Sequence, residues 1–327
     1  FAGAARSLLL EYWSVGPGDR PMLSTGSLHI PRGTPPPGGW PILARAHGTT
    51  GIGDACAPTA IEPGSRVLDY VGRWLRAGFA VVATDYVGLG TPGVHPYLDG
   101  VSAGHSVIDS VRAARAAQPD LSTTWGVIGL SQGGHASLFT ANMAPRVAPE
   151  LDFRGAVAIA PPSNLELLLP LLGPHVPLIP LEGTTSYFAY IVTGLRAARP
   201  DLDVNSYLTP RGRDVVDLLE EVCVGEADAM LGTTALGELF TRPLWETPLA
   251  DAMRTMLAVP TTGYDRPILL VQGAVDQVVP PPATAKLHLD LVAGGTDVRP
   301  IVLPYDHIDI AFESQQAAID FMRTMVS

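Results

Sequence analysis

The sequence predicts an α/β fold in which a mainly parallel sheet carries helices on both of its faces. Apolar runs alternate with segments of helical apolar spacing between residues 40 and 160, and this alternation resumes after residue 267. The run over residues 79–84 is rich in β-branched and apolar residues, as expected for a buried parallel strand. A chain of 327 residues with 46% apolar residues can also bury a large core.

Turn residues and apolar spacing place the elements in order. Strands are predicted over residues 7–15, 23–30, 40–46, 79–84, 125–129, 155–160, 267–272 and 298–303. Helices are predicted over residues 65–76, 106–117, 136–143, 282–292 and 310–325. A proline-rich loop over residues 31–41 separates the second strand from the third.

The most informative motif is G-L-S-Q-G at residues 129–133, between a predicted strand and a predicted helix. This is the context of a nucleophile elbow, in which a serine occupies a strained turn and flanking glycines avoid steric collisions. Ser131 is therefore the candidate nucleophile, and the N–H of Gln132, at a helix N-terminus, is a candidate oxyanion donor. The alternative is a glycine-flanked serine in an ordinary turn.

A second motif, H-G-T-T-G at residues 47–51, follows the third strand. In enzymes with a nucleophile elbow, the loop after this strand supplies the other oxyanion N–H. Thr50 is the preferred donor here, with Thr49 and Gly51 as the alternatives. A glycine-rich turn with a structural histidine would give the same pattern.

Two more polar residues follow strand ends late in the chain. Asp276 comes after the strand at 267–272, and His307 comes after the strand at 298–303. The order serine, acid, histidine is that of α/β-hydrolases, so the sequence predicts a triad of Ser131, Asp276 and His307. Asp306 and Asp309 flank His307, but a carboxylate adjacent in sequence is poorly placed to reach the imidazole. No chemistry is assigned to the remaining histidines: His29, His95, His105, His135, His175 and His288.

The alternation of strands and helices stops for roughly 100 residues after Pro161. This predicts a core in two parts, residues 1–162 and 261–327, and a helical cap or lid over residues 163–260, inserted after the sixth strand. Helices are expected in the cap over residues 187–196, 213–221 and 249–257. Apolar residues at its start suit an acyl chain: Leu167, Leu168, Leu169, Leu171, Leu172 and Ile179. The alternative is a second helical domain with no role in substrate binding.

Composition excludes several classes of protein. A net charge of −11 argues against nucleic acid as a partner, because binding to phosphate backbones is driven by cationic contacts. The apolar runs are too short to span a bilayer. Cys56 and Cys223 lack the spacing of a metal site, which leaves either two buried thiols or one disulfide. No metal or organic cofactor is expected. The first residue, Phe1, suits a processed chain as well as a trimmed one.

Five stretches together resemble the secretory lipase family, and in particular its bacterial members. They are H-G-T-T-G at 47–51, C-A-P at 56–58, T-D-Y-V-G-L-G at 84–90, S-A-G-H-S-V-I-D-S-V-R-A-A at 102–114 and G-L-S-Q-G-G-H at 129–135. The resemblance implies an α/β-hydrolase with a helical cap, the triad named above, and secretion. It also implies a disulfide that joins the loop after the third strand to the cap, which are the regions of Cys56 and Cys223. The chain departs from the family's yeast enzyme in lacking a second cysteine pair around His307.

These features predict a serine esterase or lipase that acts on short- to medium-chain acyl esters or acylglycerols through an acyl-enzyme. The same triad could serve an acyltransferase, or a peptidase or amidase. A catalytically silent binding protein would require the loss of a triad residue, and none is missing. No protein partner is implied, and a transient contact with a lipid interface stays open. Acyl length, alcohol preference and oligomeric state are not encoded in these motifs.

Overall fold

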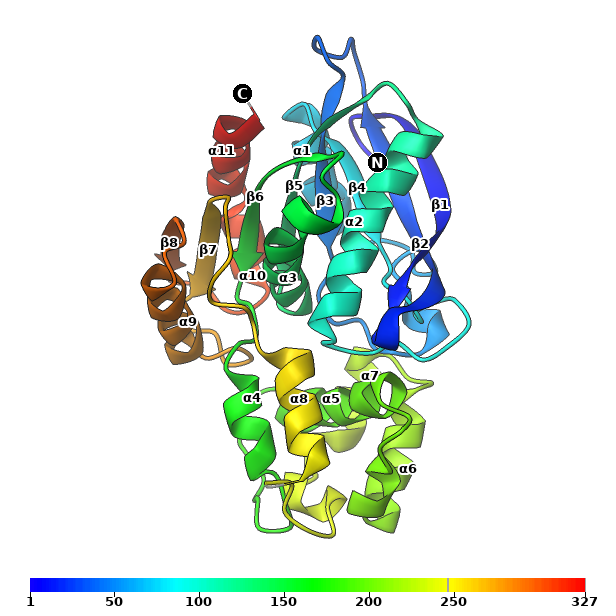
Figure 1. Cartoon of the computed structure of the whole chain (residues 1–327), viewed down its shortest axis with the longest axis vertical. Coiled ribbons are helices and arrows are strands. Elements are labelled where there is room, and N and C mark those ends of the chain that lie inside the picture. The colour runs from blue at the N-terminus through cyan, green and yellow to red at the C-terminus, as the bar shows by residue number, and fades with distance from the viewer. Residues whose placement is uncertain (246, 327) are drawn as a thin grey trace.

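The computed structural model of the protein describes residues 1–245 and 247–326, in which eight strands form one sheet of order β1-β2-β4-β3-β5-β6-β7-β8 (Figure 1). The pairs β1/β2 and β2/β4 are antiparallel, and every pair from β4 to β8 is parallel. The strands are β1 (Ala4–Gly16), β2 (Arg20–Pro31), β3 (Trp40–Ala46), β4 (Ala80–Thr84), β5 (Leu121–Leu130), β6 (Asp152–Ile159), β7 (Ile268–Gly273) and β8 (Val298–Leu303). The architecture is the expected α/β one.

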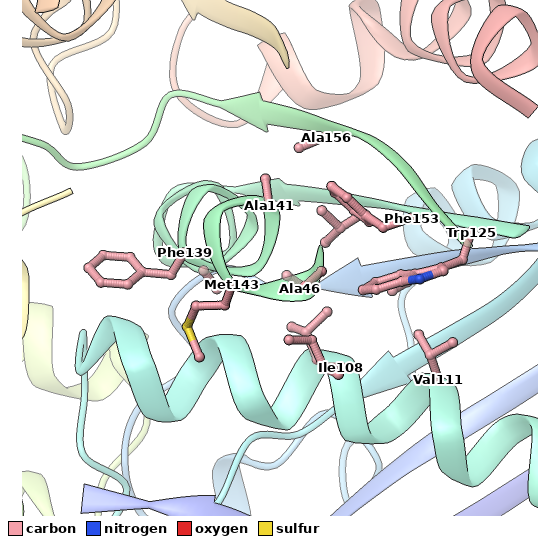
Figure 2. Packing of buried hydrophobic residues seen from close by; sticks show 14 of the residues in the cluster. Ala46, Ile108, Val111, Trp125, Phe139, Ala141, Met143, Phe153 and Ala156 are labelled. Carbon is pink, nitrogen blue, oxygen red and sulfur yellow. The ribbon is translucent and has the colours of Figure 1, made fainter. Parts of the chain in front are cut away.

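Alternate residues of the parallel strands supply two apolar layers, one on each face of the sheet. On one face, Ala44, Trp125 and Ala156 pack against α2 (Gly100–Ala117), α3 (Gln132–Val147) and α9 (Pro281–Ala293). Figure 2 shows part of this layer, in which Ile108 of α2 lies near Ala46 of β3 and Met143 of α3 points towards α2. The other face, with Leu43 and Ile128, packs against α1 (Ser65–Arg76), α10 (Asp309–Glu313) and α11 (Gln315–Val326).

Between β6 and β7 the chain forms a separate group of helices at one end of the molecule (Figure 1). They are α4 (Leu165–Leu168), α5 (Thr184–Ala198), α6 (Pro210–Leu219), α7 (Val224–Leu231) and α8 (Pro248–Leu257). This helical segment has its own apolar cluster. Ile52 and Tyr97, from loops that follow β3 and β4, join that cluster, so the segment packs beside the carboxyl ends of these strands.

The leucines at the start of the helical segment divide into two groups, which composition alone does not separate. Leu169 and Leu172 are buried in its apolar cluster. Leu167, Leu168 and Leu171 are 54%, 52% and 55% exposed. Only the second group therefore contributes apolar surface that is exposed to solvent.

Several predicted bounds differ from the observed ones. Helix α2 begins at Gly100, earlier than predicted, because the carboxylate of Asp99 accepts from Ser102 N at 3.0 Å and caps the helix. The expectation of one unbroken final helix was wrong, since α10 ends before Ser314 and α11 begins after it. The Ser314 hydroxyl donates to Ile310 O at 2.6 Å, and Gln315 donates to Tyr70 O at 2.7 Å. These contacts hold the junction against α1.

Candidate active site

Ser131 lies between β5 and α3, with φ 56° and ψ −121°. Residues other than glycine rarely adopt this backbone conformation. Its amide donates to Ile159 O at 2.8 Å, and its carbonyl accepts from His135 N at 3.0 Å. The flanking glycines have no room for a side chain. A Cβ on Gly129 would lie 2.2 Å from Gly133 O, and one on Gly133 would lie 2.0 Å from Ala46 O. The turn is thus fixed by its neighbours, as in a nucleophile elbow.

His307 and Asp276 form a buried pair. The Nδ1 of His307 lies 2.7 Å from Asp276 Oδ2, and the two residues are 6% and 4% exposed. The other carboxylate oxygen of Asp276 accepts from Val278 N at 2.9 Å and from Val279 N at 2.8 Å. Because both oxygens of the carboxylate are used, its position relative to the imidazole is fixed.

Ser131, Asp276 and His307 lie at one edge of the sheet because they follow β5, β7 and β8, and these strands run parallel through β6. Within the described residues, the Ser131 hydroxyl donates to no protein atom, and His307 Nε2 has no protein partner. The pair of Asp276 and His307 is therefore formed, and the serine hydroxyl is not bonded to the imidazole.

The two acids adjacent to His307 have other partners. Asp306 Oδ1 accepts from the amides of Ile308 and Asp309, at 3.0 and 2.8 Å. Asp309 pairs with Arg66 at 2.7 Å on the surface. Neither carboxylate is bonded to the imidazole.

The candidate oxyanion donors lie in two different environments. Gln132 is the first residue of α3, so its amide has no acceptor within the helix. The Thr50 carbonyl accepts from Val224 N at 3.0 Å. No partner for the amide or the buried hydroxyl of Thr50 occurs in the part of the chain that the structure describes. Thr49 differs, because its hydroxyl lies 2.6 Å from the Tyr97 hydroxyl.

The loop at residues 47–51 is tied to the helical segment. A disulfide joins Cys56 to Cys223, across 167 residues of sequence, and Gly51 forms an isolated β-bridge with Cys223. At the other end of this loop, Tyr86 donates to His47 O at 3.1 Å. The loop is therefore held both by the core and by the residue that precedes α7.

His95 is a contact residue of the site that motif analysis did not identify. Its Nδ1 lies 3.0 Å from Val87 O, and its Nε2 lies 2.8 Å from the side-chain nitrogen of Gln132. Burial lowers the pKa of His95 to about 4, so the ring is neutral at neutral pH. A neutral ring that donates from Nδ1 can only accept at Nε2, which fixes the orientation of the Gln132 amide. The side-chain oxygen of Gln132 is buried and has no hydrogen-bond partner among the residues that the structure describes.

Burial also lowers the pKa values of His47 and His135 to about 4. Both rings are neutral at neutral pH and bond to backbone oxygens, those of Gly48 at 2.7 Å and Leu257 at 3.0 Å, respectively. Among the described residues, no group of three or more His, Cys, Asp or Glu side chains could hold a metal ion. No helix in the described ranges has the length and apolarity needed to cross a membrane.

Solved structures show the same fold. Candida antarctica lipase A in its closed state superposes with a TM-score of 0.80 at 18% identity, over 98% of this chain and 77% of that chain. The rice cell wall degrading esterase LipA from Xanthomonas oryzae superposes with a TM-score of 0.76 at 20% identity, over 98% of this chain and 90% of that one. At these identities, the likeness establishes an α/β-hydrolase fold.

Sequence comparison identifies the family. A curated relative from Mycobacterium tuberculosis (strain CDC 1551 / Oshkosh), described as a probable inactive lipase, is 28% identical over 236 residues. The match covers 68% of this chain and only 50% of that relative, so the chain spans about half of the relative's length. A family profile described as Secretory lipase matches residues 68–326. The chain therefore belongs to the secretory lipase family.

Proposed function

We propose that this chain is a serine carboxylic ester hydrolase, an esterase or lipase that acts through an acyl-enzyme. The observation that carries the proposal is the buried pair of Asp276 and His307 at the sheet edge where Ser131 occupies its strained turn. Family membership supports the ester as the substrate class.

In the proposed reaction, Ser131 Oγ attacks the ester carbonyl carbon while His307 Nε2 takes the hydroxyl proton. Asp276 accepts from Nδ1, holds that tautomer, and stabilises the imidazolium that forms. The proton then passes to the leaving alcohol, which departs from the acyl-enzyme. Water, deprotonated by His307, attacks the acyl carbon and releases the acid. The Ser131 hydroxyl must first come within hydrogen-bond distance of His307 Nε2, because this bond is absent from the described part of the chain.

The negative charge on the tetrahedral intermediate would be stabilised by the amides of Gln132 and Thr50. The Gln132 amide lies at the positive end of α3, and neither Thr50 donor has a protein acceptor in the described chain. We assign the second donor to Thr50 because its buried hydroxyl, in addition to its amide, has no partner among the described residues, whereas the Thr49 hydroxyl is paired with Tyr97.

The helical segment, residues 163–260, would act as the cap that encloses the acyl group. Its apolar cluster and the exposed leucines Leu167, Leu168 and Leu171 favour acyl chains of short to medium length and a transient contact with a lipid surface. The disulfide and the secretory family favour an extracellular site of action.

Acyl transfer and amide hydrolysis would use the same residues, and product analysis with alcohol acceptors or amides would reveal them. The relative described as probably inactive raises a different candidate, a silent binding protein. Two observations argue against a catalytically silent protein. All three triad residues are present, and His307 is hydrogen-bonded to Asp276.

The test is hydrolysis of p-nitrophenyl esters from acetyl to palmitoyl by the wild type and by Ser131→Ala. We expect the variant to lose several orders of magnitude in kcat. The matched control is Ser137→Ala, on α3, the helix that follows Ser131. It removes a buried hydroxyl, which donates to Gly133 O at 2.8 Å. Equal rates for Ser131→Ala and the wild type would overturn the proposal.

A further inference from the structure

A groove of about 300 Å³ lies on the α1 face of the sheet, away from the Ser131 turn. Strands β1, β2 and β4, the loop at residues 58–63 and the first turns of α1 form its walls. The walls are mostly aliphatic and include Leu8, Ile61, Val67, Val71, Val81 and Ala83. Its size is at the lower end of the range of small-molecule pockets. Nothing in the proposed ester hydrolysis uses it.

Arg45 lines this groove and also a smaller cavity of about 80 Å³ behind the elbow, beside Gly48 and Leu130. It is the next-to-last residue of β3. Leu43, two residues earlier, packs in the α1 layer, so the Arg45 side chain points to the same face. The guanidinium makes no ion pair, hydrogen bond or ring contact with any residue in the described ranges. By contrast, Arg66 on the neighbouring helix pairs with Asp309 at 2.7 Å.

The charge of Arg45 is not compensated by the acid that shares the groove. Among the described lining residues, Asp85 is the only acid, and threonines bond to its oxygens. Its Oδ2 accepts from Thr25 Oγ1 at 2.8 Å and also from the Thr59 hydroxyl, and its Oδ1 accepts from Thr59 N at 3.1 Å. Burial lowers the pKa of Arg45, because the protein removes part of the water around the guanidinium and puts no acid from the described ranges in contact with it.

The groove also contains polar groups that carry no negative charge. The two ring nitrogens of His29 lie 2.9 Å from Ser7 Oγ and 3.1 Å from Ser27 Oγ. Burial and then nearby positive charges, including that of Arg45, lower the pKa of His29 to about 4. His29 is therefore neutral at neutral pH, so Arg45 and the threonine-bonded Asp85 are the charged side chains among the described lining residues, and most of the remaining lining is aliphatic.

We propose that this groove binds a monocarboxylate with an aliphatic tail, the carboxylate on Arg45 and the tail along Val67, Val71 and Val81. A guanidinium matches a carboxylate with two parallel hydrogen bonds, and such charge-assisted bonds are the strong ones. Burial of an aliphatic tail against these walls would make the binding free energy more favourable, whereas an inorganic anion would bury no apolar surface of its own. Binding itself does not depend on catalysis. Only the source of the ligand, ester hydrolysis at Ser131, rests on the proposed function.

The test is calorimetric titration of decanoate into the wild type, Arg45→Met and Arg66→Met. We expect Arg45→Met to weaken decanoate binding at least tenfold, because it removes the charge but keeps a long aliphatic side chain. Arg66→Met, on the neighbouring helix but outside the groove, should bind as the wild type does. Decan-1-ol, which lacks the charge, and inorganic phosphate, which lacks the tail, should both bind the wild type at least tenfold more weakly than decanoate.

A second variant, Ala83→Leu, tests the proposal even if Arg45→Met does not fold. Ala83→Leu keeps the cation and fills the wall of the groove, so it should weaken decanoate binding and leave acetate binding unchanged. Equal affinity of decanoate for the wild type and for either groove variant would overturn the proposal. Phosphate binding as tight as decanoate binding would overturn it too. Ser131→Ala should retain decanoate binding whether or not the wild type hydrolyses esters, so the two proposals can fail separately.

Discussion

The sheet edge around Ser131 and the start of the helical segment differ in how their side chains are held. At the sheet edge, polar groups such as Asp276 and His95 are buried and bonded to specific partners. At the start of the helical segment, Leu167, Leu168 and Leu171 present apolar surface to solvent. Fixed hydrogen bonds suit a reaction that tolerates little displacement, whereas exposed aliphatic groups suit binding without fixed geometry. We infer that chemistry and substrate choice are separated between the two regions.

Among the variants that test this separation, Asp276→Asn should have the largest effect. An amide cannot hold the same tautomer of His307 or stabilise its imidazolium, so we expect kcat to fall about 10⁴-fold with little change in fold. Steady-state kinetics on p-nitrophenyl butyrate would measure the effect. Asp306→Asn is the control, since within the described ranges that carboxylate accepts only from the backbone amides of Ile308 and Asp309. An equal loss in Asp306→Asn would show that the acid has been wrongly assigned.

Removal of the disulfide tests how firmly the two regions are joined. Cys56→Ser with Cys223→Ser should lower the free energy of unfolding by about 2–5 kcal/mol, because the bridge closes a loop of 167 residues. Urea unfolding of the double variant and of the oxidised wild type would measure the difference. Unchanged stability would mean that the junction is held by non-covalent contacts alone.

Acidification should lower the free energy of unfolding through the buried neutral histidines. The folded pKa of His135 is about 4 against 6.5 for an unperturbed histidine, so the unfolded chain binds more protons below pH 6.5. Stability is therefore complete above pH 6.5 and falls as the pH drops towards 4, by about 2 kcal/mol at pH 5 for each such histidine. Urea unfolding at pH 7 and pH 5 should show a smaller loss for His135→Gln. The control, His175→Gln, alters an exposed side chain and should lose as much as the wild type.

A smaller effect is expected at His95, which acts on the reaction through Gln132. His95→Phe removes the acceptor for the Gln132 side chain and should lower kcat about tenfold while leaving KM near its original value. His95→Gln places an amide oxygen near the position of Nε2, where it can accept from Gln132, so it should recover part of the rate. If His95→Gln and His95→Phe behave alike in kcat, the contact with Gln132 does not position the oxyanion amide.

The smallest effect should come from the leucine surface. Leu167→Ser with Leu171→Ser should lower the rate on a dodecanoyl ester by less than about tenfold and leave the acetyl ester unaffected. About tenfold corresponds to the lost burial of fewer than two methylenes, and these leucines stay half exposed, so only a small part of their surface is expected to contact the acyl chain. The ratio of the two rates measures the effect. A matched loss on both esters would contradict the separation of chemistry from substrate choice.

The sequence predicted the placement of Ser131, Asp276 and His307 because each follows a strand end, and parallel strands bring their carboxyl ends to one edge. It could not predict the contact of His95 with Gln132, which depends on how the loop after β4 returns to the elbow. The break at Ser314 was missed for a similar reason, since it depends on a bond between Gln315 and Tyr70 of a distant helix. Local spacing likewise cannot separate buried Leu169 from exposed Leu168.

The Cys56–Cys223 bridge has a mechanical consequence. Two chain crossings, between β6 and α4 and between α8 and β7, connect the helical segment to the core, and the bridge adds a third attachment before α7. A disulfide bond cannot lengthen, so Cys223 stays beside Cys56 in every motion of the oxidised chain. Any displacement of the helical segment relative to the core must therefore leave this attachment in place.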